Sequence, residues 1–172
     1  MAESRALRAL RFGTPGRTPA LARGRLISIW AVAALVATAL VIDAYVHATD
    51  AAFYEPSQGG IVSEATLFRG EAIVSGLLAV VVVLRPSPST FAAALLVAAT
   101  AVGAVVLNTY INIGAIGPLP NLYEPAWGVP GKVPSAYAEG LAVIISAAGV
   151  VLTLGRRRPG WAHRRALIEP PG

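Results

Sequence analysis

Four long apolar runs constrain this chain more than any other feature of its sequence. The first contains seventeen uncharged residues, Leu26–Ile42, and extends to His47. At a helical rise of about 1.5 Å per residue, residues 26–47 cover about 33 Å, enough to cross the hydrocarbon core of a bilayer. Three comparable runs occupy 63–84, 90–113 and 134–154. The sequence therefore predicts an all-α fold, a bundle of four transmembrane helices.

Composition and charge agree with a membrane location. The chain is 55% hydrophobic and 13% charged, whereas an average soluble domain has about 25% charged residues. Six arginines precede the first run, Arg85 lies between the second and third, and five arginines follow the fourth. Because positive residues flank membrane helices on the cytoplasmic side, we expect a multi-pass protein of the bacterial inner membrane with both termini cytoplasmic. The net charge of +5 is then a topology signal, and we expect no nucleic-acid partner.

The ends of the chain are predicted to be tails around one transmembrane domain. Residues 1–25 read as a disordered basic cytoplasmic tail, 26–155 as the domain, and 156–172 as a second basic tail. A basic segment before an apolar run also describes a signal peptide. The run is longer than the 7–15 apolar residues of such a peptide, and no convincing cleavage site follows it, so we expect it to stay as a helix. Between the second and third runs, Arg85–Ser89 is short and holds two prolines, which predicts a tight turn between antiparallel helices.

An internal similarity raises the hypothesis of two parallel repeats of a helical hairpin. The first and third runs end in the same pattern of two apolar residues, Asp or Asn, any residue, Tyr, an apolar residue, and His or Asn. Each is followed by a Tyr-Glu-Pro motif and then by a glutamate in the next helix, 17 or 16 residues after the tyrosine. The repeat loop motifs are Tyr54, Glu55, Pro56 and Tyr123, Glu124, Pro125. Such copies would be related by an axis near the membrane normal, although the loops before the two motifs differ in length.

Polar residues at the ends of the runs opposite the arginines form the candidate site. If the repeat holds, they meet near the axis, because ionisable groups in membrane helices normally face the bundle interior or a wet cavity. The candidate outer polar cluster comprises Asp43, His47, Arg69, Glu71, Asn108, Asn112 and Glu139. Asp43 and His47 are four residues apart and so share a helix face, as we also expect of Asn108 and Asn112.

Three roles suit these residue types. Asp43, His47, Glu71 and Glu139 could hold a divalent metal. His47 beside Asp43 could relay protons near neutral pH. Arg69 could bind an anionic group. Simpler readings compete with each role, namely a solvated interfacial Asp43–His47 pair, a charge pair between Arg69 and Glu71, and interhelical hydrogen bonds from the two asparagines.

The sequence contains no recognised catalytic or cofactor motif. Cysteine is absent, which excludes disulfides and thiolate chemistry, and no zinc-protease, Walker or dinucleotide-binding pattern occurs. We therefore expect no cofactor, no metal and no enzyme site of the soluble type, and the metal role above stays an alternative. The leading hypothesis is a non-enzymatic accessory or scaffold component, whose partners are the lipid bilayer and a membrane protein or second copy. The alternative is a carrier of a small solute, ion or redox equivalent, and a lipid-modifying membrane enzyme ranks third.

Three stretches carry a resemblance to other proteins, namely Asp43–His47, Leu67–Ala72 and Gly114–Gly117. With them the chain resembles a broad group of small, uncharacterised four-helix membrane proteins common in actinobacteria. In that group a polar motif ends the first helix, a Leu-Phe-x-x-Glu-Ala-like sequence opens the second, and an acidic residue opens the fourth, here Glu139. The resemblance covers about residues 26–155. It implies a four-helix bundle and adds nothing on mechanism.

Overall fold

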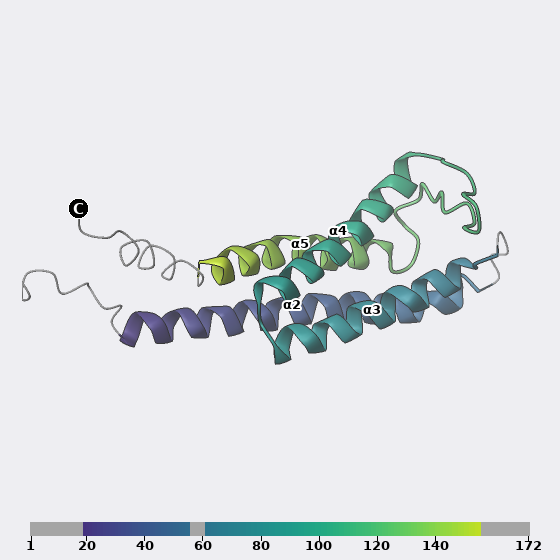
Figure 1. Cartoon of the computed structure of the whole chain (residues 1–172). Helices are drawn as coiled ribbons and strands as arrows, with labels where there is room; N and C mark the ends of the chain where they lie inside the picture. The colour runs from purple at the N-terminus through teal and green to yellow at the C-terminus, as the bar shows by residue number, and fades with distance from the viewer. Residues whose placement is uncertain (1–18, 56–60, 156–172) are drawn as a thin grey trace, which may run out of the picture.

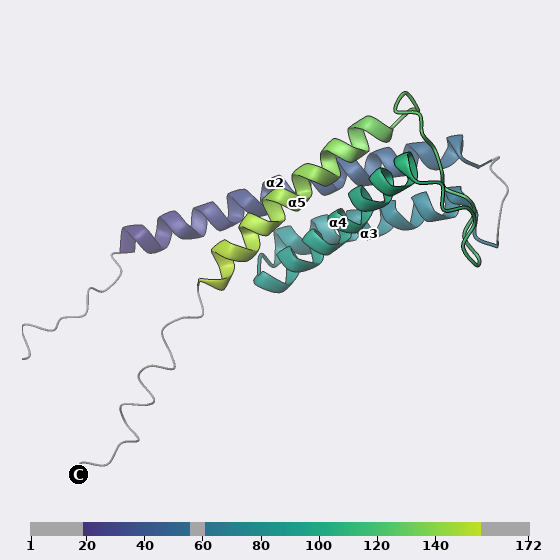
Figure 2. The ribbon, with the colours of Figure 1, turned by 90° about the horizontal axis from the view of Figure 1, so that it is seen from above.

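The protein is a bundle of four long helices. The computed structural model describes residues 19–55 and 61–155, and within them it places α2 (Pro19–Phe53), α3 (Glu64–Leu84), α4 (Pro88–Tyr110) and α5 (Lys132–Leu154). The described residues contain no strand, only one isolated bridge between Ile116 and Leu119. All four helices are long and apolar enough to cross a membrane, and they run roughly along one axis (Figures 1 and 2). The prediction of an all-α four-helix bundle is confirmed.

The helix boundaries differ from the predicted ones at several ends. α2 begins at Pro19 and continues to Phe53, so residues 19–25, predicted as tail, are helical. Nothing between His47 and Phe53 breaks a helix, since that stretch holds neither glycine nor proline. α4 ends at Tyr110 because the next residue, Ile111, has extended backbone (φ −129°, ψ 114°). The rest of the predicted tails, 1–18 and 156–172, and Pro56 of the first loop motif lie outside the described residues.

Successive helices run antiparallel. The N-terminal ends of α2 and α4 therefore lie on the same side of the bundle as the C-terminal ends of α3 and α5 (Figure 1). We call the side that holds Arg23, Arg25, Arg85 and Gly155 the basic end, and the side that holds Asp50, Glu64, Glu124 and Lys132 the acidic end. At the basic end, α3 and α4 are joined by a tight turn, as predicted. Ser87 and Thr90 form a capping box there, with Pro88 at the start of α4, a position where its missing N–H costs nothing.

α2 occupies the centre of the packing. It lies along α3 on one side and along α5 on the other, while α4 packs mainly on α5 and makes fewer contacts with α3. The interior towards the basic end is apolar, built from Ile29, Val36, Leu40, Val82 and Phe91 among others. Large apolar side chains also cover the outside of the bundle, as expected for surfaces that face lipid rather than water.

The C-terminal end of α5 is held by an arginine from α2. The Arg25 guanidinium donates hydrogen bonds to the carbonyl oxygens of Leu152, at 2.5 Å, and Gly155, at 3.4 Å. These carbonyls lack helical partners and carry the negative end of the helix dipole, so a cation stabilises them. Arg25 therefore joins the first and last helices at the basic end.

α4 and α5 approach closely where Phe91 meets Gly149. Phe91 is fully buried, and a methyl group added at Gly149 would lie 2.5 Å from its Cδ1 atom. The phenyl ring therefore occupies the space that a side chain at position 149 would need. Gly140, on the same helix, has nothing within 4 Å of the equivalent point.

Gly149→Ala should consequently destabilise the bundle by about 1–3 kcal/mol, the usual cost of overpacking. Gly140→Ala is the matched control, and it should leave stability unchanged or raise it slightly, since alanine is the better helix former. Thermal unfolding of the two variants in the same detergent tests this. Equal melting temperatures of the two variants would show that the packing of Phe91 does not require a glycine at position 149.

Candidate functional site

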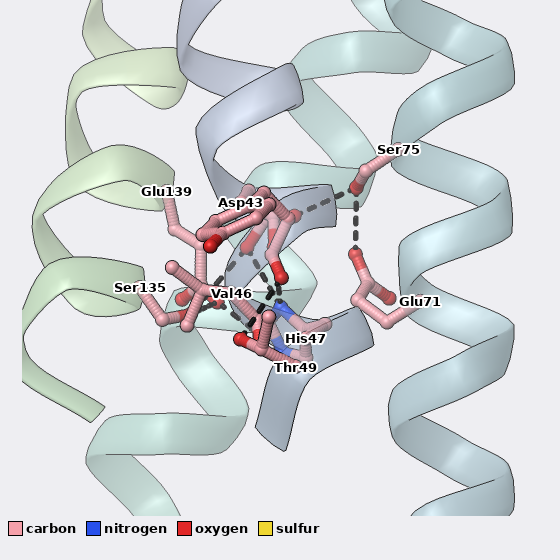
Figure 3. Close-up of polar contacts among 9 residues, drawn as sticks. Asp43, Val46, His47, Thr49, Glu71, Ser75, Ser135 and Glu139 are labelled. Carbon is pink, nitrogen blue, oxygen red and sulfur yellow. Dashed lines mark hydrogen bonds and ion pairs between the residues drawn. The ribbon is translucent and has the colours of Figure 1, made fainter. Parts of the chain in front are cut away.

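Asp43 lies at the centre of a buried polar cluster between three helices. This residue and His47, one turn later on α2, are only 2% and 7% exposed. Ser75 of α3 donates a hydrogen bond to Asp43 Oδ2 at 2.7 Å, and His47 Nδ1 lies 3.0 Å from Oδ1. Figure 3 shows this pair on α2, flanked by polar residues of α3 and of α5. The solvated interfacial pair considered from the sequence is wrong, because α2 continues past His47 and the neighbouring helices cover both residues.

The α5 side of the cluster consists of Ser135 and Glu139. Ser135 donates a hydrogen bond to Glu139 Oε1 at 2.6 Å, and its hydroxyl also lies 3.4 Å from Asp43 Oδ1. Glu139 is 1% exposed, and its Oε1 lies 3.9 Å from His47 Nε2. Its other oxygen, Oε2, has no hydrogen-bond partner among the described residues. A buried carboxylate oxygen without a partner is costly and calls for an explanation.

On the α3 side, Ser75 connects Asp43 to a third carboxyl group. Its hydroxyl lies 3.1 Å from Glu71 Oε1, in addition to the contact with Asp43 (Figure 3). Two serines thus link three carboxyl groups in the order Glu71, Ser75, Asp43, Ser135, Glu139. Each hydroxyl has a single proton, so the two serines cannot saturate the acceptors of three carboxylates. The cluster therefore has carboxylate oxygens left over that can accept a proton or bind another cation.

A cavity of about 290 Å³ at the acidic end reaches this cluster. His47, Glu71 and Ser135 of the cluster belong to its lining, to which all four helices and the α4–α5 connection contribute. Its ionisable residues include the carboxyl groups of Asp50, Glu64, Glu71 and Glu124 and one amine, that of Lys132. Asp43 and Glu139 do not line it but contact the lining residues His47 and Ser135. The cavity is acidic, and it reaches the buried cluster at His47, Glu71 and Ser135.

Aromatic rings form another part of the cavity wall. Tyr54 stacks on Phe68 with ring centroids 4.7 Å apart, and Phe68 lies 5.2 Å from the imidazole of His47. Burial, together with the nearby carboxylates of Glu64, Glu124 and Asp50, raises the pKa of Tyr54 to about 12. Its hydroxyl therefore remains protonated at any physiological pH.

The structure brings four of the seven predicted cluster residues together, namely Asp43, His47, Glu71 and Glu139. Arg69 is not among them, since it is exposed and pairs with Glu55 at 3.0 Å. The expected Arg69–Glu71 pair is wrong, because residues two apart on a helix point in different directions. Asn108 lines the cavity. Asn112 lies beyond the end of α4, where its side chain accepts a hydrogen bond from the backbone of Gly114, so the two asparagines share no helix face.

The repeat loop motifs also lie at the acidic end but in different settings. Tyr54 belongs to the cavity wall and Glu55 to the exposed ion pair with Arg69. In the second motif, the Glu124 backbone N–H donates to the carbonyl of Asn108, and the Tyr123 N–H donates to Asn121. Pro125 lies in the same connection and is exposed.

The helices pair as two hairpins, α2 with α3 and α4 with α5, which agrees with the repeat hypothesis. A two-fold axis would also make the α2–α5 and α3–α4 contacts alike. The α2–α5 contact is the more extensive of the two, so the packing departs from strict two-fold symmetry.

Sequence reasoning missed the two serines that hold the cluster together. Ser75 lies inside an apolar run, and Ser135 was read only as part of a helix start. The available signal was spacing, since Glu71 and Ser75 are four residues apart, as are Ser135 and Glu139. Residues four apart share a helix face, so each serine had to lie beside its glutamate.

Comparison of the chain with protein-family models, curated proteins and solved structures finds no match. The protein's class therefore follows from its own fold. Four apolar helices of membrane-spanning length define a multi-pass membrane protein. Any statement about its activity has to come from the geometry described above.

Proposed function

We propose that this protein is a carrier of small cations, which enter from the acidic end. The observation that carries the proposal is the acidic cavity, whose lining includes His47 of the buried Asp43–His47–Glu139 cluster. An ionisable group inside a membrane bundle is expensive to bury and marks an ion or substrate pathway by default. Here several such groups lie together at the end of one cavity.

The charge of the cavity favours a cation. Four carboxyl groups and one amine line the cavity. That amine, on Lys132, donates to the backbone carbonyl of Glu124 and lies 5.2 Å from the centre of the Trp127 ring. It is therefore already engaged. The cavity volume of about 290 Å³ lies at the lower limit for ligand pockets.

A line of small and polar residues continues from the cluster along the buried face of α5. Its polar members are Ser135, Glu139, Ser146 and Thr153, all nearly fully buried. Eighteen residues separate the first from the last, about 27 Å at the helical rise and close to the thickness of the bilayer core. Ser146 Oγ has no hydrogen-bond partner among the described residues. This line would give a cation polar contacts across most of the membrane.

The apolar core closes this route towards the basic end. Ile29, Val36, Leu40 and Phe91 fill the interior there, so release on that side requires the helices to separate. Opening on one side while the other is closed is how secondary transporters work. We place the basic end in the cytoplasm of a bacterial cell, because Arg23, Arg25 and Arg85 all lie there.

An accessory or scaffold role is the second candidate, and one observation favours it. Ala99 and Gly103 on α4 are exposed and line a shallow apolar groove with Val102 and Val106. Their small-x-x-x-small spacing permits close approach of another helix. Within the described bundle, a Cβ atom added at Gly103 would meet nothing within 4 Å. This spacing is thus available to a membrane-protein partner or a second copy of the chain.

The transport proposal predicts cation uptake into liposomes that contain the purified protein. Uptake of at least one of Na⁺, methylammonium and Zn²⁺ should exceed that of protein-free liposomes, and sulfate should not enter. Glu71→Gln should lower the rate about tenfold, the effect of losing about 1.4 kcal/mol of cation binding. Glu55→Gln is the matched control, because Glu55 is exposed and outside the cavity lining. Cation uptake no faster than in empty liposomes would refute the proposal.

The proposed orientation predicts the result of reporter fusions. Reporters placed after Gly60 and Gly131 should report the outer side of the membrane. Reporters after Pro88 and Gly172 should report the cytoplasm. The opposite pattern would mean that the cavity opens to the cytoplasm.

The scaffold proposal predicts that Gly103→Leu disrupts association without disturbing the bundle. The larger side chain blocks the groove, and its Cβ atom would meet nothing within 4 Å among the described residues. Gly70→Leu on α3, at a similarly open and exposed position, is the control. Mass measured in mild detergent should exceed the monomer for the wild type and the control and fall to the monomer for Gly103→Leu. Monomers in all three samples would count against this role.

A further inference from the structure

We propose that a divalent transition-metal ion binds between His47 and Glu139, with Asp43 orienting the imidazole. Asp43, His47 and Glu139 each offer one ligand atom, and these atoms lie within 4.8 Å of one another. All three residues are buried. The inference rests on the proposed carrier function and specifies the class of cation that the carrier binds.

The imidazole of His47 has one nitrogen left for a metal. Its Nδ1 lies 3.0 Å from the Asp43 carboxylate and 3.1 Å from the Asp43 backbone carbonyl. Both are acceptors, so Nδ1 carries the proton and donates it. In the neutral imidazole Nε2 then has a free lone pair, and this atom faces Glu139 (Figure 3). A carboxylate that fixes the imidazole from behind is the usual environment of a metal-binding histidine.

Glu139 supplies the second ligand. It is 1% exposed, and its Oε2 has no hydrogen-bond partner among the described residues. Its carboxylate faces the Nε2 of His47, with Oε1 at 3.9 Å. A buried carboxylate oxygen without a partner is costly. A metal ion beside Nε2 would compensate for this cost.

In the described part of the chain, no arginine or lysine side chain lies beside the buried cluster. The described residues contain five arginines and lysines, of which Arg23, Arg25 and Arg85 lie at the basic end. The other two are engaged, Arg69 with Glu55 and Lys132 with the Glu124 carbonyl. In the described part of the chain, the carboxylates of the cluster therefore have no arginine or lysine beside them, and His47 is their basic neighbour. A divalent ion would neutralise them.

The ligand types and distances point to a transition metal. Imidazole suits Zn²⁺ and its neighbours in the first row, whereas Mg²⁺ and Ca²⁺ prefer oxygen ligands alone. In a tetrahedral zinc site with bonds of about 2.0–2.1 Å, ligand atoms lie about 3.3 Å apart. The Nε2–Oε1 distance of 3.9 Å thus needs to close by about 0.6 Å. The other coordination positions of the metal ion can be filled by water from the cavity. An ion held by only two protein ligands can be released as well as bound.

Titration of the full-length protein in detergent with ZnCl₂ at constant pH tests the inference. We expect one zinc ion per chain by calorimetry and no comparable binding of Mg²⁺ or Ca²⁺. Co²⁺ provides a test on the unaltered protein, since ligation by imidazole in a site of low coordination number intensifies its visible absorption. A Co²⁺ spectrum like that of the ion in water would overturn the proposal.

Variants assign the roles of the three residues. His47→Ala and Glu139→Gln should abolish stoichiometric zinc binding. Asp43→Asn should weaken it by about 10–100-fold, the usual effect of losing a residue that orients a ligand. Glu55→Gln, the same chemical change at an exposed position, should bind zinc as the wild type does. Circular dichroism of each variant verifies that the helices are retained, and undiminished binding by folded His47→Ala would overturn the assignment.

The liposome measurement separates this inference from the function on which it rests. If the protein moves Na⁺ or methylammonium but neither binds nor moves Zn²⁺, the carrier proposal stands and the metal site is refuted. If Zn²⁺ binds at His47 and Glu139 but no cation crosses, the metal site stands and the carrier proposal is refuted.

Discussion

The burial of the Asp43 carboxylate is the constraint on which the rest of this structure depends. A carboxylate inside a membrane bundle is stable only where other groups replace the water it has lost. Ser75, His47 and Ser135 do so, and they come from three helices. Each of these helices must therefore present a polar group at the same depth. The arrangement of α2, α3 and α5 at the acidic end follows from that requirement.

Small residues let the helices meet this requirement. Serine provides a hydroxyl with little bulk, so α3 and α5 can approach α2 closely at Ser75 and Ser135. Towards the basic end the interior is mainly apolar, with Ser146 and Thr153 as its buried hydroxyls, and there Gly149 gives room to Phe91. The bundle thus combines a closed apolar half with a polar half that a cavity reaches from the acidic end.

Much of the fold and part of the site were predictable from particular residues. The four runs and the arginines beside them specify four crossings, because length and apolarity alone determine what a bilayer accepts. The pairing of Asp43 with His47 follows from helical periodicity. Arg69 shows the limit of such reasoning, because it lies close to Glu71 in sequence but pairs with Glu55 across the connection between α2 and α3. Asn112 was misplaced for a related reason, since α4 ends two residues before it and helical spacing no longer applies.

By itself, the sequence determined the class of protein, the number of helices and the ends at which charges gather. These properties depend on local composition and on the bilayer, not on which helix lies beside which. Only the tertiary structure decided that α2 lies between α3 and α5, which places Glu71 and Glu139 on opposite sides of Asp43. It also decided that Glu139 turns its carboxylate towards His47 and leaves one oxygen without a hydrogen-bond partner among the described residues. The physical reason is that contacts between helices depend on the rotation and depth of each one, which a largely uniform apolar sequence specifies only weakly.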